Sequence, residues 1–168
     1  EHTAALRGLD ALYTEDSRWD ELDAVLNRRV LVAEYDEEQI KLLTRLAELY
    51  RDKLDRPEDA IGALKKVVDL DEGNLSALRD LAALYQASEA WQALFDCYEQ
   101  LSTLASDENE RLQTFEKMAV LSETQLGRAE DSIGLWEEVL LLKADHMDAL
   151  HQLQRLLEDA AKWEDLAE

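Results

Sequence analysis

The chain has few of the residues that make tight turns, since its 168 residues include one proline and five glycines. This scarcity argues against an all-β protein, in which close turns between strands depend on both residues. A single cysteine, Cys97, cannot form an internal disulfide, which fits a reducing compartment and favours a cytoplasmic location. Apolar runs such as residues 139–142 are far shorter than the ~20 residues of a membrane-spanning helix.

Positive charge is also scarce. The chain has 18 Lys and Arg residues against 39 Asp and Glu residues, which gives a formal net charge of −21. Such a charge repels phosphate backbones and anionic lipid surfaces, so we expect neither nucleic acid nor a membrane as partner. Hydrophobic residues make up 46% of the chain, enough to build a folded core rather than a disordered segment.

The apolar residues recur at spacings of three and four almost throughout, which predicts a succession of helices. The first is expected over residues 2–14, and short connections predict that consecutive helices pack antiparallel. Ser17 and Ser88 read as N-caps of the second and sixth helices. The other predicted starts and stops are at Asp36, Pro57, Asn74, Asp107, Gly127 and Asp145, with a tenth helix near Lys162.

One set of three leucines and a tryptophan occurs three times along the chain. It reads Leu78, Leu81, Leu84 and Trp91, with counterparts at Leu6, Leu9, Leu12 and Trp19 and at Leu150, Leu153, Leu156 and Trp163. The repeating unit is a helix pair of roughly 36 residues in two alternating versions, typical of a helical solenoid, so the double-repeat period is about 72 residues. The sequence predicts an all-α solenoid forming one domain over residues 1–168, of about 4.5 repeats, with units at 2–35, 36–73, 74–106, 107–144 and a truncated 145–168.

These residues resemble the tetratricopeptide repeat family, whose first helix carries W-x2-L-G-x2-Y. Here the motif reads Leu78-x2-Leu81-Ala82-x2-Tyr85 and Leu43-x2-Leu46-Ala47-x2-Tyr50, and the second-helix A-x3-F reads Ala60-x3-Leu64 and Ser132-x3-Trp136. Asp10 and Gln154 depart from the small residue of the motif. The resemblance implies a right-handed superhelix of antiparallel helix pairs. It also implies a concave groove for a partner peptide or helix, with no catalysis and no cofactor. We expect this chain to be a fragment of a longer helical-repeat array, because it does not start with Met and closes inside a helical pattern.

The groove is expected to be lined by residues of the first helices that flank the core stripe. We predict a mildly basic groove that takes an acidic or amphipathic segment, because Arg forms planar bonds with carboxylates. The alternative is that these residues are ordinary solvated side chains paired with acids such as Glu48, Asp80 and Glu116. A clamp for a C-terminal carboxylate is not expected, since no Asn occupies the positions that would form it. The candidate groove residues are Arg7, Ala11, Lys41, Arg45, Arg79, Ala83, Lys117, His151 and Arg155.

Other chemically distinctive residues are given structural roles. Trp19, Trp91, Trp136 and Trp163 are predicted to pack in the core, and Cys97 to be buried or inert, because Asp96 and Glu99 flank it. His146 and Asp148 fall at a helix start that Asp145 caps, so we expect neither a metal site nor an enzyme. A second functional hypothesis is a structural spacer, or end-to-end self-association through exposed apolar residues such as Leu156 and Leu166.

Overall fold

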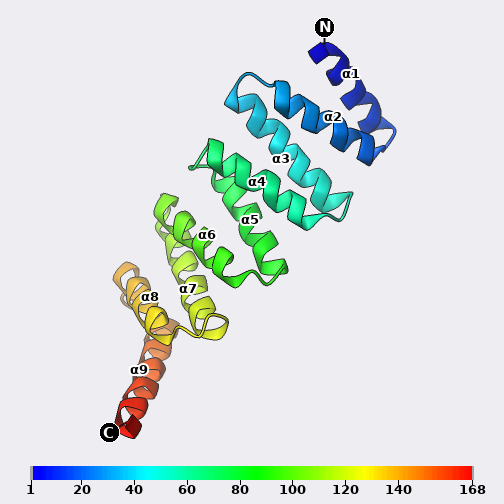
Figure 1. Ribbon diagram of the computed structural model, residues 1–168. Helices are drawn as coiled ribbons and strands as arrows, with labels where there is room; N and C mark the ends of the chain where they lie inside the picture. The colour runs from blue at the N-terminus through cyan, green and yellow to red at the C-terminus, as the bar shows by residue number, and fades with distance from the viewer. Residues whose placement is uncertain (1, 168) are drawn as a thin grey trace. The chain divides into compact units, whose positions relative to one another are not determined.

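A computed structural model describes the backbone of residues 2–167 and the side chains of residues 3–161. Over that range all regular secondary structure is α-helical, which confirms the predicted all-α class (Figure 1). The helices are α1 (His2–Glu15), α2 (Trp19–Val32), α3 (Asp36–Asp52), α4 (Pro57–Leu70), α5 (Leu75–Ala87), α6 (Trp91–Leu104), α7 (Glu108–Thr124), α8 (Ala129–Leu142) and α9 (Met147–Ala167).

The chain divides into two compact units, which we call unit 1 (up to Leu84) and unit 2 (from Tyr85). In unit 1 each of α1, α2 and α3 packs against the helix that follows it, and in unit 2 the same holds for α6, α7 and α8. Within each unit these neighbours run in opposite directions, as their short connections require (Figure 1). The prediction of one domain with a right-handed superhelical turn stays a prediction.

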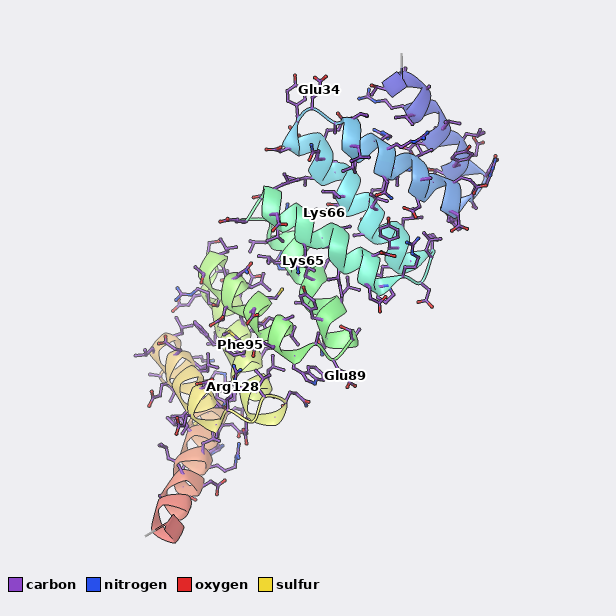
Figure 2. The ribbon with its side chains drawn as sticks, in the orientation of Figure 1. Glu34, Lys65, Lys66, Glu89, Phe95 and Arg128 are labelled. Atoms are coloured by element: carbon purple, nitrogen blue, oxygen red, sulfur yellow. The ribbon has the colours of Figure 1, made fainter. Side chains whose placement is uncertain are left out.

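The turn inside each helix pair is made by one residue with positive φ. These residues are Ser17 (56°), Asp55 (51°), Glu89 (56°, labelled in Figure 2) and Gly127 (65°). Ser17 and Glu89 occupy equivalent positions of the double repeat, and so do Asp55 and Gly127. The next N–H groups reach back to the end of the preceding helix, as Ala90 N does to Tyr85 O at 2.9 Å. A left-handed residue after a helix allows this closure.

This turn explains why the predicted N-caps at Ser17 and Ser88 are wrong. The N-cap positions are occupied by Arg18 and Ala90, neither of which caps with its side chain. Ser17 instead supplies the left-handed turn residue, and Ser88 Oγ donates to the Tyr85 carbonyl at 3.3 Å. At both turns the chain direction is therefore set by a backbone hydrogen bond to the end of the preceding helix, from Arg18 N to Tyr13 O and from Ala90 N to Tyr85 O, rather than by a side-chain cap.

The helix starts between pairs follow ordinary capping chemistry. Ala77 N donates to Asn74 Oδ1 at 3.1 Å and Asn109 N donates to Asp107 Oδ1 at 3.3 Å, which confirms both predicted caps. At α9 the predicted cap Asp145 is wrong, because Ala149 N donates to Nδ1 of His146 at 3.2 Å.

The tenth helix predicted near Lys162 is also wrong, since α9 runs without a break from Met147 to Ala167. Ala161 is the counterpart, one double repeat later, of the turn residue Glu89. Ala160, Ala161 and Lys162 all favour the helix interior, so nothing in the sequence stops α9 there. The side chains of Trp163 and Leu166, for which roles were predicted, lie outside the described side chains.

The buried residues follow the repeat, with exceptions. Leu78, Leu81 and Leu84 are buried, whereas Leu9 and Leu12, their counterparts on α1, are exposed. Leu156 was predicted to be exposed but is buried, in a cluster with Ala119, Trp136, Val139 and Ala149. Leucines at equivalent positions of the repeat are therefore buried only where a neighbouring helix covers them.

The predicted burial of Trp136 and Cys97 is confirmed, with exposed fractions of 4% and 6%. Trp19 and Trp91 are partly buried, so their packing in the core stays a prediction. Lys53 Nζ lies 5.4 Å from the centroid of the Trp19 ring, within the range of a cation–π contact. Among residues 2–167 no helix combines the length and apolar character that crossing a bilayer requires.

Candidate functional site

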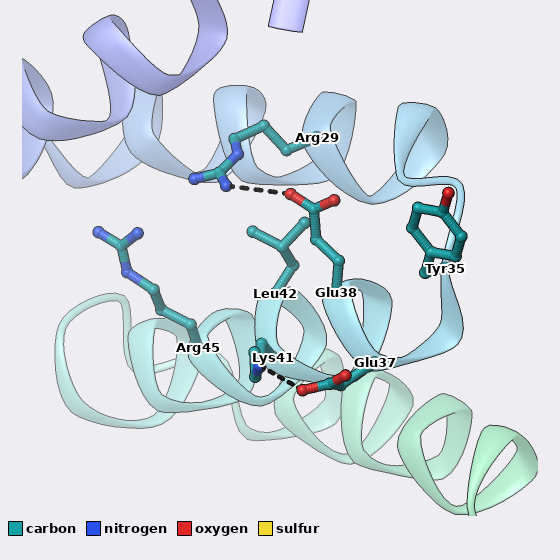
Figure 3. Close-up of a pocket in the computed structure, with 7 residues that line it drawn as sticks. All are labelled: Arg29, Tyr35, Glu37, Glu38, Lys41, Leu42 and Arg45. Atoms are coloured by element: carbon teal, nitrogen blue, oxygen red, sulfur yellow. Dashed lines mark hydrogen bonds and ion pairs between the residues drawn. The ribbon is translucent and has the colours of Figure 1, made fainter. Parts of the chain in front are cut away.

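Unit 1 has an open cleft of about 510 Å³ beside α2 and α3 (Figure 3). Charged side chains make up most of its lining, and a short stretch of α3 supplies most of these residues. The lining residues are Arg29, Tyr35, Glu37, Glu38, Lys41, Leu42 and Arg45.

The cations of this cleft are held by carboxylates of unit 1. Asp10, which is 4% exposed, forms a bidentate pair with Arg45, with Nη1 to Oδ2 at 2.8 Å and Nη2 to Oδ1 at 2.7 Å. Arg29 contacts the same carboxylate, and Glu38 Oε1 lies 3.1 Å from Arg7 Nη2 and 3.7 Å from Arg29 Nη2. This Asp10 network of three guanidinium groups and two carboxylates ties α1, α2 and α3 together.

Lys41 differs from the arginines because its pair is at the surface. Its Nζ lies 2.7 Å from Glu37 Oε1, and the two side chains are 72% and 83% exposed (Figure 3). An exposed pair of this kind contributes about 0.3–0.5 kcal/mol on a helix. The unit 1 cleft is thus a self-neutralised surface, in which only this weak pair could be opened at little cost.

Unit 2 has a cleft of similar volume, about 530 Å³, with a different character. Its apolar lining comes from the second helices α6 and α8 and from one face of α7. The lining residues are Gln86, Trp91, Leu94, Tyr98, Glu116, Lys117, Val120, Leu121, Thr124, Trp136, Asp148 and Gln152. We call this the unit 2 cleft.

Apolar side chains dominate the unit 2 cleft. Val120 on α7 is 50% exposed, and Trp91 and Tyr98 on α6 are half-buried, so all three present apolar surface to solvent. Trp136 closes the cleft from α8, and its buried Nε1 has no hydrogen-bond partner among the described residues. An indole N–H usually finds a partner when buried, so this site carries an unmet donor.

Three charged residues, Glu116, Lys117 and Asp148, also line the cleft. Lys117 Nζ lies 5.9 Å from the Tyr98 ring centroid and pairs with no carboxylate in the described part of the chain. Glu116 Oε1 lies 3.0 Å from Nε2 of His146. Because Nδ1 of His146 accepts from the Ala149 N–H, the imidazole proton is on Nε2 and is donated to Glu116. Asp148 lies in the first turn of α9.

The structure separates the nine predicted groove residues. Lys41 and Arg45 line the unit 1 cleft and Lys117 lines the unit 2 cleft. Arg7 and Arg155 form ion pairs of their own, the latter with Glu123 at 2.7 Å. The residues that line neither cleft are Arg7, Ala11, Arg79, Ala83, His151 and Arg155, all of them exposed.

Sequence reasoning missed the aromatic part of the unit 2 cleft. Trp91, Tyr98 and Trp136 follow the helical period of the core, and that period cannot tell a core position from a cleft position on a second helix. The sequence does predict one residue of this lining, since Lys117 is among the candidate groove residues.

The cleft residues do not suggest covalent chemistry. Burial, with a smaller effect of Asp96, raises the pKa of the nearby Cys97 thiol to about 11, which keeps it protonated and unreactive near neutral pH. Burial likewise raises the pKa of Tyr98. Over the described residues there is no group of His, Cys, Asp and Glu side chains that could hold a metal ion.

No protein-family model and no curated protein matches this sequence. Solved structures are similar to it. The MamA protein is 19% identical, with 97% of this chain and 88% of that one covered and a TM-score of 0.56. YrrB, a TPR protein with an unusual peptide-binding site, is 17% identical, with 89% of this chain and 73% of that one covered and a TM-score of 0.53. A tetratricopeptide repeat protein from Parabacteroides merdae is 14% identical, with 94% of this chain and 60% of that one covered and a TM-score of 0.58.

At these identities the likeness concerns the fold and not the partner. The similar structures cover nearly all of this chain, and the nine helices of residues 2–167 follow the repeated motif. The chain therefore has a tetratricopeptide-repeat-like fold of stacked helix pairs.

Proposed function

We propose that this protein is a non-catalytic interaction module whose unit 2 cleft binds a peptide or helix of a partner protein. The observation that carries the proposal is the solvent-open apolar surface formed by Val120, Trp91 and Tyr98, with Trp136 behind it. In a chain with 34% charged residues, such a surface is costly to leave exposed to water unless a partner covers it.

The size and residue types of the cleft suit an apolar side chain. Burying a Leu, Phe or Met side chain contributes about 1.5–3 kcal/mol, and a cleft of about 530 Å³ has room for one with part of its backbone. Trp and Tyr are enriched among the residues that dominate binding energy in protein complexes. The peptide-binding site named for YrrB is a property of that protein, and it supports the proposal by analogy of fold.

The unit 1 cleft is the weaker candidate. A ligand there would have to compete with Asp10 and Glu38 for the arginines, and removing one partner of a buried ion pair is costly. We therefore place the partner in unit 2.

A selection experiment tests the proposal without assuming the partner. A random peptide library displayed on phage is selected on the wild-type protein, and the enriched peptides are measured by fluorescence anisotropy. Val120→Glu should weaken their binding about tenfold or more, because it places a carboxylate in the apolar cleft. Since Val120 is half-exposed, the variant should fold normally, which circular dichroism and thermal melting would check.

The matched control is Leu141→Glu, which makes the same kind of change on α8 at a residue that is 78% exposed and lies outside the cleft lining. Binding should be unchanged. Enriched peptides that bind both variants as well as the wild type, or the absence of any enriched peptide, would refute the proposal. Light scattering on the same samples tests the alternative, because self-association predicts a mass that rises with concentration.

A further inference from the structure

We infer that the segment bound by the unit 2 cleft is cationic: an apolar side chain with Lys or Arg next to it in the bound structure. The inference rests on the proposed function of the same cleft. It differs from the expectation drawn from sequence, in which Arg and Lys side chains would make a basic groove for an acidic segment.

The first reason is that most cations of the expected basic groove already have carboxylate partners. Arg45 is paired with Asp10, Arg7 with Glu38 and Lys41 with Glu37. Arg155 donates to Glu123 at 2.7 Å and to Gln152 at 2.9 Å. A carboxylate arriving from a partner would have to displace an internal one, so these side chains offer it little net attraction.

The second reason is the charge at the unit 2 cleft itself. Its lining has two carboxylates, Glu116 and Asp148, against one ammonium group, Lys117. Glu116 has the imidazole of His146 as its partner, with Nε2 at 3.0 Å from Oε1, and no Lys or Arg among the described residues pairs with that carboxylate. Asp148 has no ion-pair partner in the described part of the chain and lies in the first turn of α9, where the helix dipole favours a negative charge.

The third reason is the position of the one cation. Lys117 Nζ lies 5.9 Å from the Tyr98 ring centroid and forms no ion pair with either carboxylate in the described part of the chain. The net charge of −21 adds a long-range attraction for a cationic segment and a repulsion for an acidic one. A cleft lined by apolar side chains and by two carboxylates therefore fits an amphipathic segment with Lys or Arg flanking its apolar face.

Two synthetic amphipathic helical peptides test this inference. They share the same Leu and Trp positions, and every charged position is Lys in one and Glu in the other. By fluorescence anisotropy at about 0.15 M salt, the Lys peptide should bind at least about tenfold more tightly. Asp148→Asn should weaken it by about two- to fivefold, as expected for one partly exposed ion pair, while Lys117→Gln should strengthen it.

Two controls separate a defined site from general attraction to an acidic protein. Glu137→Gln removes an exposed carboxylate of α8 that does not line the cleft, and should change binding less than Asp148→Asn. Val120→Glu should weaken the Lys peptide in spite of its added negative charge. If the Lys peptide binds Val120→Glu and Asp148→Asn as well as wild type, its attraction is diffuse and the inference is overturned.

The remaining outcomes distinguish the inference from the proposed function. If both peptides bind equally, or the Glu peptide binds better, and binding depends on Val120, the cleft is a binding site but the cationic preference is wrong. If neither peptide binds in a way that depends on Val120, both the inference and the proposed function are contradicted.

Discussion

The clefts of unit 1 and unit 2 differ because residues at equivalent positions of the repeat form ion pairs in one cleft and leave apolar side chains exposed in the other. Arg45 and Lys117 occupy equivalent positions, and Arg45 is fixed by Asp10, while Ala82 stands in the place equivalent to Asp10. Glu48 of unit 1 corresponds to the exposed Val120 of unit 2. The same helical framework thus carries a charged cleft closed by its own ion pairs in unit 1 and a cleft with exposed apolar surface in unit 2.

The helix pairs behind the clefts differ in the same way. In unit 1 Tyr50 is buried, and its hydroxyl donates to Asp23 Oδ1 at 2.7 Å and accepts from Asn27 Nδ2 at 3.0 Å. In unit 2 Ser122 replaces Tyr50 and Phe95, labelled in Figure 2, replaces Asp23. The large aromatic residue of the pair is on the first helix in unit 1 (Tyr50) and on the second helix in unit 2, where Trp136 on α8 replaces Leu64 on α4. Across the double repeat, Tyr50 and Leu64 are thus exchanged for Ser122 and Trp136, which puts the aromatic residue of the pair on the second helix.

The largest effect is expected from reversing this exchange. Trp136→Leu should lower the free energy of unfolding by about 3 kcal/mol, because it leaves a cavity in a core position that is 4% exposed. Ser122→Tyr alone should cost about 1–3 kcal/mol through overpacking. Together they restore the pair found in unit 1, so the double variant should recover at least about 1 kcal/mol, as measured by urea denaturation. Strictly additive losses would show that the two positions do not exchange volume.

Removing the carboxylate at the centre of the Asp10 network is expected to have the next largest effect. Asp10→Asn should cost about 3 kcal/mol, because it leaves Arg29, whose side chain is 14% exposed, with only its longer contact to Glu38. Thermal unfolding would measure the loss, and Glu37→Gln, which breaks only the exposed pair with Lys41, should change stability by less than about 0.5 kcal/mol. Equal effects of the two substitutions would contradict the structural role of the network.

Substitutions at two turn residues should change the free energy of unfolding by smaller amounts and in opposite directions. Gly127→Ala should destabilise by about 1 kcal/mol, because an added Cβ meets no atom within 4 Å and only the positive φ of 65° opposes it. Glu89→Gly should stabilise by up to about 1 kcal/mol, since Glu89 holds a φ of 56° that glycine adopts more readily. Chemical denaturation of both variants would test this, and a destabilised Glu89→Gly would mean that the Glu89 side chain has a role of its own.

The smallest change in stability is expected at Cys97, which corresponds to Val25, with both residues 6% exposed. Cys97→Val should alter the free energy of unfolding by less than about 1 kcal/mol at pH 7. Because folding raises the pKa of the thiol from 9.0 to about 11, the folded state holds its proton more tightly. This contribution to stability is complete below pH 9 and is lost as the pH rises toward 11.

Thiol labelling measures the same difference. In the folded protein the thiolate fraction of Cys97 near neutral pH should be about 100-fold below that of the unfolded chain, so iodoacetamide should react correspondingly slowly. Rapid labelling of the folded protein near neutral pH would contradict the burial of Cys97.

The helices and the double repeat can be predicted from sequence because they depend on local periodicity and capping. The N-cap errors at Ser17 and Ser88 arose because the left-handed turn residue, which most side chains disfavour, leaves no reliable sequence signal in three of the four turns. The Asp10–Arg45 pair joins residues 35 positions apart, so no local pattern indicates that Arg45 is already bound. The clefts depend on which helix faces are covered, and that is a property of the packed units.

The most direct test of the account is a proton–nitrogen correlation spectrum of the tryptophan indole groups during titration with a peptide selected on the wild-type protein. Trp91 lines the unit 2 cleft, while Trp19, its counterpart one double repeat earlier, lines neither cleft and serves as an internal control. We predict that the indole signals of Trp91 and Trp136 shift and that the Trp19 signal stays in place. A bound peptide that shifts Trp19 and leaves Trp91 and Trp136 unchanged would place the binding surface outside the unit 2 cleft and contradict the account.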